Sequence, residues 1–192
     1  PVLVEDAYQL DAILGAKKRH SLNRIETVLL QETETRDVNL GIEAQLADSS
    51  GYWLATLTGL DVRSEQVGNP SRSFQIWRGT LRRSHNLAKG YAAVGSLNWQ
   101  HTNDDVLPSS EQFLIGGEGS VRGYQTGVLS GDRGATVNLE LHHPIALLEG
   151  EAAGPQASGF FFVDYGQVRP FRPVGDPRDD KAVIVEIRSG AG

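Results

Sequence analysis

The stretch Glu111-Gln-Phe-Leu-Ile-Gly-Gly-Glu-Gly-Ser-Val-Arg-Gly-Tyr124 is the part of this chain that says most about its fold. It gathers glycines and a serine around a single arginine, Arg122, and it ends on an aromatic residue, Tyr124. Glycine permits positive φ values and close backbone approach, so this composition is typical of a tight, folded-back loop with one cation at its tip. A buried guanidinium needs a partner, because an unpaired buried charge is costly. Asp164, within Phe162-Val-Asp-Tyr-Gly166, offers one.

Around this stretch the dominant pattern is a period of two between apolar and polar residues. Such alternation predicts β-strands with one apolar face and one polar face. The clearest strands cover 38–46, 91–100, 135–141 and 183–187, and weaker candidates cover 23–32, 52–62, 73–84 and 159–168. Turn-forming residues separate them without helical crossovers, which predicts an antiparallel sheet. Residues 1–16 alone favour a helix, through Val4, Ala7, Ile13 and Leu14.

Composition narrows the class of protein. The chain has 192 residues and a formal net charge of -6, which argues against general nucleic-acid binding. It contains no cysteine, so disulfides and thiolate metal sites are not expected. It has no apolar run of the ~18 residues that a transmembrane helix needs. A transmembrane β-barrel stays possible, because its strands alternate and keep the average hydropathy low, and a soluble β-domain fits equally well.

Several kinds of chemistry are not expected. The run Gly116-Gly-Glu-Gly119 lacks the Lys-Ser/Thr ending and the following helix of a phosphate-binding loop, so no nucleotide is predicted. His142 and His143 would point to opposite faces of a strand and could not chelate one metal ion. No Ser-His-Asp order with a nucleophile elbow is present. We therefore predict no catalytic residues, no cofactor and no metal site.

Two motifs carry a resemblance to a known family. Ile115-Gly-Gly-Glu-Gly-Ser-Val-Arg-Gly-Tyr124 closely resembles the signature of TpsB transporters, the outer-membrane partners in two-partner secretion, also called hemolysin activation/secretion proteins. Phe162-Val-Asp-Tyr-Gly166 is similar to the second barrel motif of the family, aromatic-x-Asp-x-Gly. The clear match covers about 107–168. The family belongs to the superfamily that contains BamA.

The resemblance implies an all-β fold, an antiparallel transmembrane β-barrel of sixteen strands with a long loop folded into its lumen. Residues 1–192 would form part of that barrel, the loop would cover about 117–134, and the POTRA domains of the family would lie outside this chain. The expected lumen-loop motif is Val121, Arg122, Gly123 and Tyr124, with loop glycines Gly116, Gly117 and Gly119, and the expected barrel-wall motif is Phe162, Asp164 and Gly166. Arg122 would meet Asp164 there, and Gly166 would leave room for the loop.

The function implied is export of a large, unfolded TpsA-type adhesin or hemolysin across the bacterial outer membrane, without nucleotide. The partners would be this secreted protein and outer-membrane lipid. The polar strand faces would line a wet pore, through Asn39, Glu43, Gln45, Asn98, Gln100, Asn138 and Glu140. Two alternatives stay open at this point. One is a BamA-like insertase of outer-membrane proteins, and the other is a soluble β-sandwich that acts as a binding module.

Overall fold

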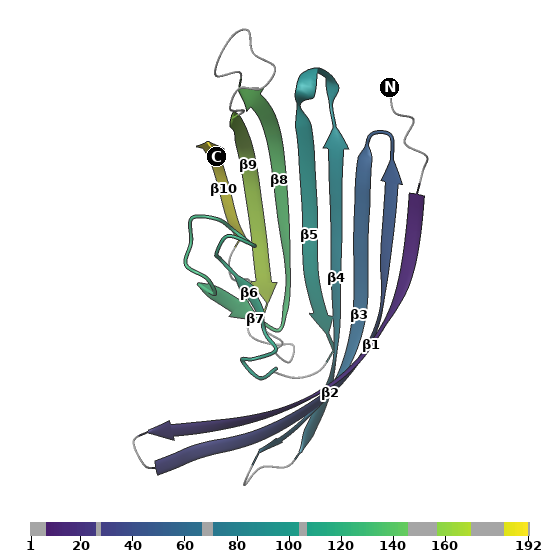
Figure 1. Ribbon diagram of the computed structural model, residues 1–192. Helices are drawn as coiled ribbons and strands as arrows, with labels where there is room; N and C mark the ends of the chain where they lie inside the picture. The colour runs from purple at the N-terminus through teal and green to yellow at the C-terminus, as the bar shows by residue number, and fades with distance from the viewer. Residues whose placement is uncertain are drawn as a thin grey trace.

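The chain forms a curved antiparallel sheet that carries a short hairpin on its concave face (Figure 1). A computed structural model describes residues 7–25, 28–66, 71–103, 107–145, 157–169 and 183–191. The main sheet has eight strands in the order β1-β2-β3-β4-β5-β8-β9-β10, and a second sheet pairs β6 with β7. The all-β, antiparallel prediction is therefore confirmed.

The strands follow the predicted alternation. The first five are β1 (Ala7–Ile25), β2 (Val28–Asp48), β3 (Gly51–Gln66), β4 (Arg72–Asn86) and β5 (Ala92–Thr102), with a short 3-10 turn, η1 (Ala88–Gly90), before β5. The others are β6 (Phe113–Ile115), β7 (Leu129–Gly131), β8 (Arg133–Ile145), β9 (Ala157–Arg169) and β10 (Val183–Ala191). Strands of the main sheet that follow one another in the chain pair with each other, and β5 pairs with β8 across the inserted hairpin.

Two local predictions at the N-terminal end are wrong. Residues 7–16 form part of strand β1 and not a helix, because a complete cross-strand partner, β2, supplies their backbone hydrogen bonds. The predicted strand 23–32 is not one element, since β1 ends at Ile25 and β2 begins at Val28. Residues 1–6 lie outside the described residues. Within the described part of the chain, no helix is long and apolar enough to cross a membrane.

The two faces of the sheet differ sharply in polarity. Residues that lie opposite each other in the register share a face, so the alternation of one strand continues into the next. The convex face carries large apolar side chains that remain exposed, among them Leu10, Leu40, Ile42, Leu57, Trp77, Leu139 and Phe161. A contiguous exposed apolar surface of this kind marks contact with a partner or with lipid.

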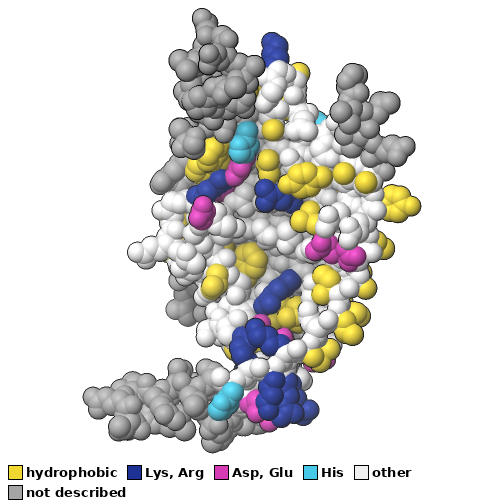
Figure 2. Space-filling model, viewed as in Figure 1, with side chains coloured by type: hydrophobic (Ala, Val, Ile, Leu, Met, Phe, Trp, Pro, Cys, Tyr) yellow, Lys and Arg dark blue, Asp and Glu magenta, His cyan; other side chains and the backbone are white. Residues whose placement is uncertain are grey.

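The concave face is polar along the middle of the sheet. By the same register it carries all the side chains predicted to line a pore, Asn39, Glu43, Gln45, Asn98, Gln100, Asn138 and Glu140. Basic and acidic side chains lie together down this face (Figure 2). The hairpin β6–β7 and the segments that flank it pack against it.

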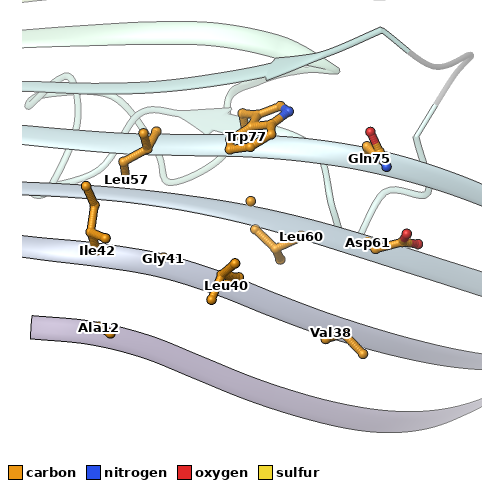
Figure 3. A pocket seen from close by; sticks show the side chains of 11 residues that line it. Ala12, Val38, Leu40, Gly41, Ile42, Leu57, Leu60, Asp61, Gln75 and Trp77 are labelled. Carbon is orange, nitrogen blue, oxygen red and sulfur yellow. The ribbon is translucent and has the colours of Figure 1, made fainter.

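A shallow apolar groove of about 500 Å³ lies on the convex side of β1–β4, between side chains such as Leu40, Ile42 and Leu57 (Figure 3). The ring of Trp77 closes one side of it by covering Gly59 of the neighbouring strand, where an added Cβ would lie 3.0 Å from the ring. Trp99 covers Gly79 in the same way. In each pair the aromatic ring covers a glycine on the neighbouring strand and fills the space that a side chain would otherwise occupy.

Candidate functional site: a loop anchored on the concave face

The connection between β5 and β8 runs over residues 103–132 and includes the short strands β6 and β7. Its tip, which we define as residues 117–124, is a closed turn in which the Gly117 amide donates to the Tyr124 carbonyl at 3.0 Å. Gly116 and Gly117 enter this turn with φ values of 104° and 91°. An added Cβ on Gly116 would lie only 2.1 Å from the Gln125 carbonyl oxygen. Both the backbone conformation and the lack of space therefore require glycine there.

Arg122 lies at this tip and contacts Asp164 of β9 through one edge of its guanidinium. Nε donates to Asp164 Oδ2 at 2.8 Å, and Nη2 donates to Oδ1 at 2.6 Å. The backbone amide of Arg122 also donates to Oδ2, at 3.0 Å. Parallel hydrogen bonds of this type fix orientation as well as distance, because the planar guanidinium matches the planar carboxylate. The tip is therefore held in a defined position on the sheet.

Two residues of β8 complete the polar contacts of the tip. Nη1 of Arg122 donates to Glu140 Oε1 at 2.5 Å. The side-chain amide of Asn138 donates to Asp164 Oδ1 at 2.8 Å and also to the backbone carbonyl of Ser120. Asn138 thus contacts the wall partner and the loop at once. Sequence reasoning placed both residues on a polar wall but did not identify them as partners of the loop.

The aromatic residue of the second motif lies directly under the cation. The guanidinium carbon of Arg122 is 3.8 Å from the centre of the Phe162 ring, and this ring is itself buried. A cation over an aromatic face is attracted by the quadrupole of the ring. Phe162 and Asp164 stand two residues apart on the same face of β9, so one strand supplies both the stacking surface and the carboxylate.

Apolar contacts fix the approach of the loop to β9. Ile115 and Val121 are fully buried and cluster with Val168. A Cβ added to Gly166 would lie 2.8 Å from Val121 and 2.9 Å from Ile115. The absence of a side chain at Gly166 therefore allows both loop residues to touch the wall.

The guanidinium of Arg122 stays charged beside the carboxylate of Asp164. The Asp164 side chain is 0% exposed, whereas that of Arg122 keeps 18% exposure. The hydrogen bond to Asp164, with help from Glu140, raises the pKa of Arg122 above its already high ordinary value. Because the guanidinium stays charged at every physiological pH, titration of the arginine does not break its contact with Asp164.

The remaining motif residues have lesser roles in the geometry. Tyr124 contributes its carbonyl group to the turn, and its side chain is 41% exposed. Gly123 has a positive φ of 89°. Gly119 has nothing within 4 Å of an added Cβ, so neither space nor conformation requires a glycine there.

The adjacent histidines lie on opposite faces, and each stacks on an aromatic ring. His142 packs on Phe160 at 5.3 Å and contacts Glu140, whereas His143 packs on Tyr91 at 4.5 Å. Within the described residues, no cluster of His, Asp and Glu side chains could hold a metal ion.

Comparison with known proteins finds a matching family model and related transporters. The family model "Haemolysin secretion/activation protein ShlB/FhaC/HecB" matches residues 5–176. The heme/hemopexin transporter protein HuxB of Haemophilus influenzae is 28% identical in an alignment of 148 residues that covers 71% of this chain and 25% of HuxB. The outer membrane transporter CdiB of Dickeya dadantii is 33% identical over 90 residues, which are 47% of this chain and 15% of CdiB.

A loop that an arginine pins to the polar face of an antiparallel sheet is the arrangement expected of a TpsB-type transporter. The chain belongs to the haemolysin secretion/activation protein family ShlB/FhaC/HecB. The resemblance inferred from the two motifs is thereby confirmed, and the family is one of outer-membrane transporters in Gram-negative bacteria. The chain spans about a quarter of the length of HuxB.

Proposed function

We propose that this chain is part of a sixteen-stranded outer-membrane barrel that exports a large, unfolded TpsA-type protein to the cell surface. The observation that carries the proposal is the bidentate contact between Arg122 and Asp164, which holds a loop on the polar side of the sheet. In this proposal the concave face lines the lumen, the convex face meets lipid, and residues 117–134 form the lumen-folded part of the loop. No nucleotide, cofactor or catalytic step is involved.

The distribution of polarity supports a membrane setting. Exposed Leu40, Leu57 and Leu139 on the convex face would be shielded by acyl chains. Outer-membrane barrels show this pattern, with apolar residues outward and polar residues inward along every strand. Along the middle of the concave face many side chains are amides, hydroxyls and charges, and a sliding polypeptide could exchange hydrogen bonds with them without being held at one point.

The site also supports a gating role for the loop. The tip is attached by hydrogen bonds, one stacked ring and a small apolar cluster of Ile115, Val121 and Val168. A passing chain that competes for these few contacts can break them, because local opening of a protein needs less free energy than global unfolding. We therefore infer that the tip occupies the path of the exported chain at rest and is displaced during export.

The test is export by the full-length protein in cells that also produce its cognate secreted partner. With the intact transporter the partner should reach the surface, and without it the partner should remain in the periplasm. The levels of unrelated outer-membrane barrels are measured in parallel. Surface delivery of the partner without the transporter would contradict the proposal, and a general loss of other barrels would favour the insertase alternative. A full-length protein that stays monodisperse in water without detergent would favour the soluble module.

A further inference from the structure

A second cluster of charged side chains lies at the base of the loop, away from Arg122. Glu111 is 3% exposed, although it is a carboxylate in a connecting segment. Arg19 of β1 donates through Nη2 to Glu111 Oε1 at 2.9 Å, and Arg78 of β4 donates through Nη2 to Oε2 at 3.2 Å. The contact with Arg19 joins residues 92 positions apart in the chain. A carboxylate buried to this degree is retained only when it is paired.

The backbone of Glu111 is held as firmly as its side chain. Its carbonyl oxygen accepts from Gln100 Nε2 at 2.8 Å and from Arg78 Nη2 at 3.2 Å. Gln100 in turn accepts from Arg78 Nε at 2.8 Å and donates to the backbone carbonyl of Asp132 at 3.1 Å. Gln100 of β5 therefore contacts the segment that enters the loop and the segment that leaves it.

Apolar packing reinforces the same place. Leu107 is 2% exposed and packs against Val62, Phe74 and Ile76 of β3 and β4. Its backbone amide donates to Asp132 Oδ1 at 2.8 Å, which closes the base of the loop on itself. These contacts lie on β1, β3, β4 and β5, whereas the tip contacts β8 and β9. Among the described residues, the base is held by the side chains of Arg19, Arg78 and Gln100, whereas the tip is held by those of Asn138, Glu140, Phe162 and Asp164.

We propose that Glu111 is a positioning residue that anchors the base of the loop independently of the Arg122–Asp164 latch. The base stays fixed to β1 and β4 when the tip leaves β9, and the backbone between them turns at Gly116 and Gly117, where φ is positive. The loop then moves as a flap with a fixed root. Only the tip moves during export. This part of the proposal rests on the proposed transport function.

The two anchors are separated experimentally by thiol labelling of the full-length protein in membranes. Residues 1–192 contain no cysteine, so an introduced cysteine is the only thiol in this part of the protein. Leu107→Cys reports the base, because Leu107 is buried. Ser120→Cys reports the tip, because the Ser120 hydroxyl is shielded from solvent. Each is labelled with a maleimide in the background of Glu111→Gln, Asp164→Asn or the control Glu118→Gln, an exposed glutamate of the tip.

Glu111→Gln should raise the labelling rate at Leu107→Cys about tenfold or more, as expected when charge-assisted hydrogen bonds are lost, and should leave Ser120→Cys unchanged. Asp164→Asn should do the reverse, and Glu118→Gln should change neither. Adding Arg78→Gln to Glu111→Gln should have less effect than Arg78→Gln alone. If Glu111→Gln fails to assemble, Arg19→Gln and Arg78→Gln, which change half-buried partners of Glu111, must each raise labelling at the base.

An unchanged rate at Leu107→Cys in these variants, or equal acceleration at both reporters, would overturn the proposal. The rates are measured without the secreted partner. A protein that shows the predicted rates but exports nothing would therefore contradict the transport function and leave the second anchor intact.

Discussion

Arg122 and Asp164 stand 42 residues apart in the chain and meet through parallel hydrogen bonds of 2.8 and 2.6 Å. The contact joins the tip of a glycine-rich loop to the middle of strand β9. Phe162 beneath the guanidinium and Asn138 beside the carboxylate extend it into a small network. Release of the tip in the full-length protein in membranes is measured as the labelling rate of Ser120→Cys.

Arg122→Lys should release the tip almost as readily as Arg122→Ala. A lysine keeps the charge but cannot form two parallel hydrogen bonds to one carboxylate while also reaching Glu140. The loss of one charge-assisted hydrogen bond should lower the free energy of tip opening by about 1.5–3 kcal/mol. The labelling rate of Ser120→Cys should rise accordingly. A rate for the lysine variant equal to that of the parent would show that charge alone holds the tip.

Gly166→Ala should displace the loop from the wall. The added methyl group would lie within 3 Å of Val121 and Ile115, and overpacking of this kind costs about 1–3 kcal/mol. Gly119→Ala is the matched control, because nothing lies within 4 Å of its added Cβ. The measurement is the labelling rate at Ser120→Cys in each variant. Equal labelling rates in the two variants would show that the loop does not depend on its close approach to Gly166.

Phe162→Leu should weaken the latch, and Phe161→Leu should not. The Phe162 ring lies 3.8 Å from the guanidinium carbon of Arg122, whereas Phe161 faces outward and is 63% exposed. A desolvated cation–π contact contributes about 2 kcal/mol, and leucine keeps most of the apolar volume while removing the quadrupole. Labelling at Ser120→Cys should accelerate for the first variant alone. An equal rise of the labelling rate in both variants would show that the cause is altered packing in β9 and not the loss of the cation–π contact.

Leu40→Arg should destabilise the protein in the membrane far more than Asn39→Arg. The two residues are adjacent on β2 and face opposite sides of the sheet, with Leu40 66% exposed on the convex face. An arginine on the lipid side of a barrel costs about 2–4 kcal/mol near the bilayer midplane, whereas lumen positions tolerate charge. The checks are abundance in the outer membrane and heat-dependent migration. Equal tolerance of both substitutions would mean that the convex face does not meet lipid.

Two motifs of the sequence predicted the contact between Arg122 and Asp164 that the structure shows. Alternation identified most strands, and the spacing of Phe162, Asp164 and Gly166 placed them on one face. The helix predicted at the N-terminal end was wrong, because it depended on a few residues with helical spacing. These residues belong to β1, whose backbone pairs with the neighbouring strand β2. Long-range pairing of this kind overrides local preference.

The other partners of the loop depend on strand register. Asn138 lies opposite Asp164, and Glu140 lies opposite Phe162, so both reach Arg122 in this pairing of β8 with β9. A shift of one residue would turn them to the other face, and no pattern within β8 indicates the pairing. Glu111 was missed for a related reason, since its partners Arg19 and Arg78 lie on β1 and β4, far from it in the chain. Gln112 separates Glu111 from the apolar run Phe113-Leu-Ile115, and this position offered no distinguishing signal.

The most direct test of the account is a double-mutant cycle on export. Full-length proteins carrying Arg122→Ala, Asp164→Ala or both are compared for delivery of the secreted partner to the cell surface, at matched outer-membrane abundance. Because each substitution breaks the same latch, the two single variants should show similar defects, and the double variant should be little worse than either. Normal export by Arg122→Ala at normal abundance, or defects that simply add in the double variant, would contradict the latch as the element that positions the loop.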